Sequence, residues 1–124
     1  MDFGVEQELK EMAKRAAQLE SLKFSLEFPD EDTTKMAYAI EYGHRINNTI
    51  VPPCPFMRAT RNIHSSEWND LLEKLGKKFV EGWHGMSLDY VAKPVAERME
   101  DDYKDSAITY GVPTDIYDGL RVVW

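Results

Sequence analysis

Three stretches of the chain repeat their hydrophobic residues at a spacing that is typical of helices. In residues 3–22 apolar side chains recur every three or four positions, which predicts a helix with one buried face. A clearer stripe predicts a second helix, which takes Ser65 or Ser66 as its N-terminal cap and runs to about Trp83. A third helix is expected over residues 87–107, with a bend at its internal proline.

Other stretches alternate between bulky and small or polar residues, as strands with one buried face do. Phe24, Leu26 and Phe28 alternate with polar residues and predict a half-buried strand. Residues 36–42 show the same alternation and predict a second strand, which is expected to form a hairpin with the first. Residues 120–124 predict a final strand.

The segment between residues 44 and 51 is polar and predicts an exposed loop with Asn47 and Asn48 at its centre. Pro52–Pro55 must follow in an extended conformation, because proline fixes its own φ and restricts the residue before it. The order of elements predicts a single α+β domain over residues 1–124. We expect a small antiparallel sheet with three helices, two of them long and packed on one face.

Size and composition support a single globular domain and exclude some functions. The chain has 124 residues and a formal net charge of −7, which is unfavourable for general binding to nucleic-acid phosphates. Its only cysteine, Cys54, excludes a disulfide within the chain and a metal site built from cysteines alone. No apolar run approaches the roughly 20 residues of a membrane span, and the acidic start of the chain differs from a signal peptide.

The residues that most often carry chemistry do not form a recognisable motif in this sequence. His44, His64 and His84 are spaced 20 residues apart, whereas metal ligands usually include a close pair on one element. No phosphate-binding glycine loop and no nucleophile motif is present. We therefore predict a protein that is not an enzyme, with no catalytic, cofactor-binding or metal-binding residues.

Two features are candidates for contacts with other chains. Arg45, Arg58 and Arg61 flank the predicted loop and the proline segment, either as scattered surface charge or as a basic patch that faces an acidic patch on another copy of the chain or on a partner. The apolar end of the chain, which closes with Trp124, is expected either to pair within the chain's own sheet or to be held by a neighbouring chain.

Two linked segments resemble the signature of the tail-completion, or neck, proteins of long-tailed bacteriophages. The segments are Ala39–Gly43 and Pro52–Arg58. In that family an alanine-rich strand ends in Glu-aromatic-Gly, and a Pro-x-Arg-Pro-Phe-Leu/Met-Arg motif follows a variable loop. The resemblance covers roughly residues 35–108. Cys54 departs from it, because the family usually has arginine at that position.

The resemblance implies a structural virion protein, made in the host cytoplasm, that forms a homo-oligomeric ring, often a hexamer, at the head–tail interface. Its partners would be further copies of itself, the head connector or adaptor protein, and the tail terminator or tail tube protein. DNA would pass through the lumen without specific binding, and no membrane would be involved. The expected interface residues are His44, Arg45, Asn47, Asn48, Arg58, Arg61 and Trp124.

Two alternatives remain open at the level of sequence. A tail-terminator protein that caps the tail tube would share much of this pattern. A small non-enzymatic adaptor module would instead use the loop and the arginines to dock a peptide or a helix from a partner.

Overall fold

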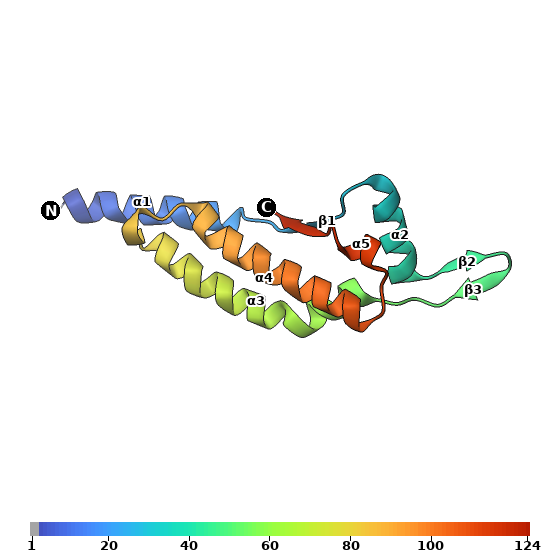
Figure 1. The fold of residues 1–124 in the computed structure, drawn as a ribbon. Helices are drawn as coiled ribbons and strands as arrows, with labels where there is room; N and C mark the ends of the chain where they lie inside the picture. The colour runs from blue at the N-terminus through green and yellow to red at the C-terminus, as the bar shows by residue number, and fades with distance from the viewer. Residues whose placement is uncertain (1–2) are drawn as a thin grey trace.

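Two long antiparallel helices form the centre of the molecule and define its elongated shape (Figure 1). The structure is a computed structural model and describes residues 3–124. Helix α3 spans Phe56–Val80 and α4 spans Leu88–Thr109, and a short 3-10 turn, η1 (Trp83–Gly85), connects them. Helix α1 (Phe3–Glu20) lies along the end of this pair that carries η1.

Helix α1 docks on α3 through its C-terminal half. Gly76 of α3 allows this approach, because a Cβ built there would lie 2.7 Å from Cδ2 of Leu19. Arg15 adds a polar contact, since its Nε donates to the main-chain oxygen of Val80 at 3.0 Å. Farther toward the N-terminus, the same apolar stripe is exposed at Val5 and Leu9. The predicted helix is therefore confirmed, with half of its apolar stripe covered by its own chain.

The strands form two separate antiparallel pairs. Strand β1 (Ser25–Glu27) pairs with β4 (Arg121–Val123), and β2 (His44–Ile46) pairs with β3 (Thr49–Val51). The first and last predicted strands are thus confirmed, and the last one is held within its own chain. The coarse α+β class is also confirmed, but the single small sheet is not.

Residues 36–42 are not a strand, because they belong to helix α2 (Glu31–Tyr42). Asp30 caps this helix, and its Oδ1 accepts a hydrogen bond from the main-chain N–H of Thr33 at 2.7 Å. The buried positions are Thr33, Ala37 and Glu41, which follow a helical spacing of four. The prediction failed because these inward-facing residues are small or polar, whereas the bulky residues that carried the alternation are exposed, namely Met36, Tyr38 and Tyr42.

The predicted loop and the predicted second helix also differ from the structure. Residues 44–51 form a β-hairpin, which turns at Asn47 and Asn48 with positive φ angles of 47° and 65°. Asparagine tolerates this conformation better than most residues do. Helix α3 begins at Phe56, well before the expected serine cap, and Trp83 lies beyond its end. With α2 included, the described part of the chain has four long helices in place of the three expected, and a short α5 (Thr114–Tyr117) precedes β4.

Two clusters of buried hydrophobic residues lie between the helices and the β1–β4 pair, and further buried residues of α3 and α4 pack outside them. One lies where α2, α3 and α5 meet, and the other lies where α3 and α4 face β4. No helix among residues 3–124 combines the length and the apolar character that a membrane crossing requires. The buried hydrophobic residues of the clusters are Ala37, Phe56, Ala107, Val112 and Ile116 in the first, and Trp68, Ala96, Tyr103, Leu120 and Val122 in the second.

Candidate functional site

The two segments that resemble the neck-protein signature meet in a buried polar contact between α2 and α3. The carboxylate of Glu41, only 1% exposed, accepts hydrogen bonds from the main-chain N–H groups of Met57 at 2.9 Å and Arg58 at 3.0 Å. The Arg58 side chain closes the contact: its Nε donates to Glu41 Oε1 at 2.9 Å and its Nη2 donates to the Glu41 main-chain oxygen at 2.9 Å. We call this arrangement the Glu41–Arg58 clamp.

The clamp also serves as an N-terminal cap for α3. The first N–H groups of a helix have no partner within the helix, and the positive end of the helix dipole favours an anion there. The residue before α3 is a proline and provides no side-chain cap. Glu41 supplies the anion from a different helix, which explains how α3 begins at Phe56 without the serine cap that the sequence indicated.

Aromatic rings on α2 hold the guanidinium of Arg58 from the outside. Its Cζ lies 4.7 Å from the centre of the Tyr42 ring, a cation–π distance. Tyr42 in turn stacks on Tyr38, with ring centres 6.1 Å apart. Arg58 is therefore fixed by a carboxylate on one side and by an aromatic ring on the other.

The clamp stands at the base of the β2–β3 hairpin, where the chain leaves the body and returns to it. Gly43 lies at this exit with a φ of +81°, and a Cβ there would lie 2.8 Å from the Val51 oxygen and 3.0 Å from the Pro53 nitrogen. On the returning side, the main-chain N–H of Cys54 donates to the oxygen of Ile40 at 2.8 Å. Both ends of the hairpin are thus tied to the end of α2.

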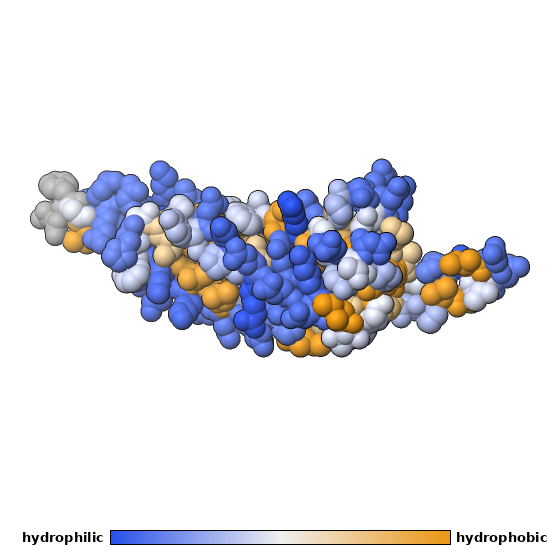
Figure 2. All heavy atoms as spheres, in the orientation of Figure 1, coloured by the Kyte–Doolittle hydropathy of each residue, from blue (hydrophilic) through white to orange (hydrophobic). Residues whose placement is uncertain are grey.

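The hairpin itself projects from the body as an arm (Figure 1), and apolar side chains are visible on its surface (Figure 2). We call residues 44–51 the arm. Ile46 is 53% exposed and Ile50 is 69% exposed, so two large apolar side chains of the arm lie largely in solvent. Four predicted interface residues lie on the arm: His44, Arg45, Asn47 and Asn48.

The other three predicted interface residues lie elsewhere. Arg58 and Arg61 both line a cavity of about 410 Å³ on the body, and the charge of Arg58 is already paired with Glu41. Trp124 follows β4, and its Nε1 donates to Oδ1 of Asp89 near the start of α4 at 3.0 Å. The structure therefore distributes the seven residues over the arm, the cavity and the end of β4.

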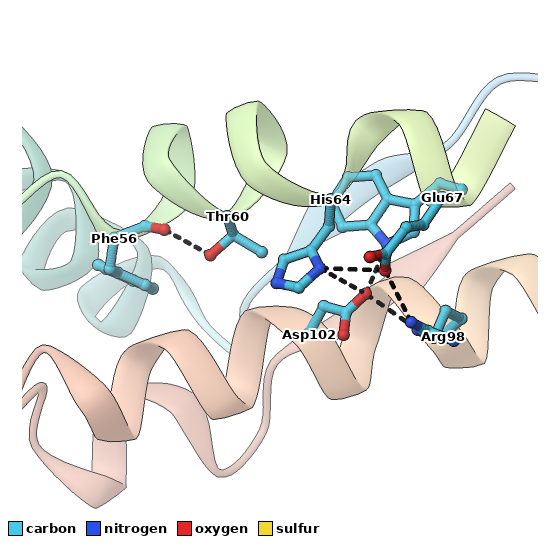
Figure 3. Close-up of polar contacts among 7 residues, drawn as sticks. Phe56, Thr60, His64, Glu67, Arg98 and Asp102 are labelled. Carbon is cyan, nitrogen blue, oxygen red and sulfur yellow. Dashed lines mark hydrogen bonds and ion pairs between the residues drawn. The ribbon is translucent and has the colours of Figure 1, made fainter.

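The sequence did not indicate a second polar cluster, which lies between α3 and α4 (Figure 3). His64 Nδ1 lies 3.3 Å from Glu67 Oε2 and 3.7 Å from Asp102 Oδ2. Arg98 bonds both carboxylates, through Nη2 to Glu67 at 2.8 Å and through Nε to Asp102 at 3.2 Å. The indole N–H of Trp68 also donates to Asp102 Oδ2, at 2.7 Å.

Histidine, glutamate and aspartate are common metal ligands, but the two carboxylates of this cluster are already paired with the guanidinium of Arg98. The ligand atoms of His64, Glu67 and Asp102 lie within 4.8 Å of one another. The guanidinium of Arg98 occupies the carboxylate edges, and its hydrogen bond and charge interaction with Asp102 raise its own pKa. The arrangement is therefore best explained as an ion network that joins α3 to α4. The sequence signal for this network is the helical spacing of its charged residues: His64 and Glu67 are three residues apart, and Arg98 and Asp102 are four apart.

Comparisons of the chain with protein-family models, with curated proteins and with solved structures find no match. The likeness to phage neck proteins therefore rests on the motif residues alone.

Proposed function

We propose that this protein is a structural virion protein of a long-tailed bacteriophage. In this proposal several copies form a ring at the head–tail interface, where the ring joins the head connector to the tail tube. The observation that carries the proposal is the Glu41–Arg58 clamp. The residues that resemble the neck-protein signature build one device, which fixes both ends of a projecting arm.

A projecting arm suits a protein that assembles into a ring. Ring closure needs two different surfaces on each copy, so that each copy contacts its neighbour head to tail. The arm presents Ile46 and Ile50 away from the body, where burial against another chain would remove apolar surface from water. The clamp reduces the freedom of the arm before it binds, which lowers the entropic cost of association.

The charge of the chain is compatible with DNA passing through the ring. Each copy has a formal net charge of −7, so six copies would carry about −42. DNA phosphates bind to surfaces rich in lysine and arginine and are repelled by acidic ones. We expect a lumen that lets DNA pass without holding it.

The tail-terminator role remains an alternative within the same class of structural proteins. A terminator ring that caps the tail tube would use the same arm for contacts between copies. A non-enzymatic adaptor module is the alternative from a different class. It is favoured by the cavity of about 410 Å³, which Tyr38, Tyr42 and Met57 line beside the clamp.

Virions of a phage that encodes this chain provide the test. Mass spectrometry of purified particles should detect the protein, and electron microscopy with a labelled copy should place it in the neck. Replacement of residues 45–50 by a two-residue turn should leave the melting temperature unchanged and yield separate heads and tails. An Ile63→Ala variant, changed at an exposed position on α3, should assemble normally.

The following results would exclude or limit parts of the proposal. Absence of the protein from virions would exclude a structural role altogether. Location at the far end of the tail would exclude a neck role, and location directly on the tail tube would favour the terminator role. If the arm replacement lowers the melting temperature, the arm is part of the folding unit and its loss says nothing about assembly.

A further inference from the structure

Strand β1 has one unpaired edge. It pairs with β4 on one side only, and Leu26 lies opposite Val122. The N–H of Val122 points away from β1, because it donates to Glu100 Oε1 at 2.8 Å. In an antiparallel pair, two opposite residues point their main-chain groups either both inward or both outward. The N–H and C=O of Leu26 therefore point outward, and within residues 3–124 the hydrogen bonds of turns and loops do not include them.

An apolar groove runs beside this open edge. A cavity of about 230 Å³ lies next to β1 and is bordered by Leu26, Tyr38 and Met57. The larger cavity of about 410 Å³ shares the same three residues and continues toward Arg61. Tyr38 is 55% exposed, so its ring forms an accessible wall of the groove on α2. An unpaired strand edge beside an apolar groove is the arrangement in which an added strand gains both main-chain and side-chain contacts.

The arm offers a strand that matches this edge. Ile46 and Thr49 close the two-residue turn, and Ile50 lies opposite Arg45 in the next pair. In a two-residue hairpin the closing pair exchanges hydrogen bonds, so the main-chain groups of the next pair point outward. The outer edge of β3 therefore presents the N–H and C=O of Ile50, the most exposed isoleucine among the described residues.

We propose that the arm of a second copy of this chain pairs its β3 edge with the open edge of β1. In this pairing Ile50 lies opposite Leu26 and exchanges two main-chain hydrogen bonds with it. Opposite side chains in such a pair lie on the same face. Leu26 packs against the core, and so Ile50 enters the groove over Met57 beside Tyr38.

Charge favours the same pairing. The arm contains Arg45 and no acidic residue, whereas β1 ends at Glu27 and is followed by Asp30, Glu31 and Asp32. An arm and an acceptor of opposite charge attract each other, and opposite charge also favours the correct orientation.

The acceptor belongs to another copy because the clamp ties both ends of the arm and directs it away from the body (Figure 1). Arm and groove are different surfaces, so the contact is heterologous and continues from copy to copy. The closure of this series into a ring rests on the proposed function, whereas the contact itself rests on the geometry of β1 and the arm.

Two variants that each disable one side of the contact provide the test. Ile50→Asp places a charge on the arm and leaves the groove intact, and Tyr38→Lys places a charge in the groove and leaves the arm intact. Both positions are more than half exposed. Ile50→Asp should melt at the wild-type temperature, and Tyr38→Lys, which also loses the stacking on Tyr42, should stay folded with a slightly lower melting temperature. Ile63→Asp, a matched change at an exposed isoleucine on α3, is the control for added surface charge.

Sedimentation velocity and light scattering should show that the wild type and Ile63→Asp form oligomers that grow with concentration. Each of the two variants alone should associate at least about tenfold more weakly, because an unpaired charge is costly to bury. An equimolar mixture of the two should form a dimer that does not grow further, since it contains one intact arm and one intact groove that can meet.

Several results would overturn this pairing. One such result is a wild type that stays monomeric up to about 1 mM, because a contact with a Kd below 1 mM would be populated at that concentration. Alternatively, Ile50→Asp would associate like the wild type, or the mixture would fail to form dimers. These outcomes are separable from the proposed function. A monomer that is present in phage necks would exclude the pairing alone, and a working mixture with no protein in virions would exclude the phage role alone.

Discussion

Removal of the Glu41 carboxylate tests whether the clamp holds α2, the arm and α3 together. In Glu41→Ala, the N–H groups of Met57 and Arg58 lose their acceptor, and the Arg58 guanidinium loses its ion pair. The side chain of Arg58 is 42% exposed, so water can replace part of what it loses. The two main-chain N–H groups are partly buried at the start of α3, and no other acceptor for them is found among residues 3–124.

The magnitude follows from these contacts. A hydrogen bond to a charged group contributes about 1.5–3 kcal/mol, and a buried donor left without a partner costs about 1–3 kcal/mol. Loss of one partner of a buried ion pair typically costs about 3–5 kcal/mol, and we expect Glu41→Ala to fall in that range. Glu41→Gln keeps the shape and one oxygen acceptor, so its cost should be smaller, about 1.5–3 kcal/mol.

Urea denaturation followed by far-ultraviolet circular dichroism measures the free energy of unfolding of both variants. Glu73→Gln, at an exposed position in α3, is the matched control and should change it by less than about 0.5 kcal/mol. The expected order is Glu41→Ala, then Glu41→Gln, then the control. A loss below about 1 kcal/mol in Glu41→Ala would refute the conclusion that this contact holds the base of the arm.

Three further predictions concern the same part of the fold. Phe56→Ala, at a fully buried position, should lower the free energy of unfolding by about 3–5 kcal/mol, whereas Ile63→Ala on the surface should be nearly neutral in the same urea assay. Gly43→Ala should lower the melting temperature more than Gly111→Ala. Both glycines have a positive φ, but of the two only Gly43 would place a Cβ against the main chain, at a further cost of about 1–3 kcal/mol. Equal losses in the two variants would contradict this close contact at Gly43. The hydrogen bond from the main-chain N–H of Thr33 lowers the pKa of Asp30 below 3.8, so the stability that the Asp30 carboxylate contributes is present above that value and is lost as the pH falls through the folded-state pKa. Urea denaturation between about pH 5 and pH 2 should show that Asp30→Asn lacks this loss of stability at low pH. A profile identical to that of the wild type would exclude the cap.

Local pattern predicted the elements in which the buried residues are large and apolar. The stripes of α1 and α4 and the alternation of β1 locate these elements to within a few residues. The pattern failed for α2, because its inward face consists of Thr33, Ala37 and Glu41, and two of these are polar. Glu41 is buried only because α3 supplies its hydrogen-bond donors, and those donors lie 16 and 17 residues away along the chain.

The candidate site was partly visible in the sequence. Both segments of the clamp were recognised as a linked motif, and the arm was expected to be exposed, although as a loop. The pairing of Arg58 with Glu41 was not expected, and neither was the ion network around Asp102. The Glu41–Arg58 pair joins α2 to α3, and the Arg98–Glu67 and Trp68–Asp102 bonds join α4 to α3. Local spacing does not reveal how those helices are rotated toward each other.

By itself, the sequence determined the acidic charge, the absence of an internal disulfide, the long amphipathic helices and the rigid proline segment. These properties depend on residue type and on spacing along a few turns of chain. Only the tertiary structure decided that α2 is a helix, that residues 44–51 form a projecting arm and that one edge of β1 stays open. Each of these depends on which distant groups satisfy the main-chain and buried polar atoms, and such pairings are made across the fold, beyond the reach of local spacing.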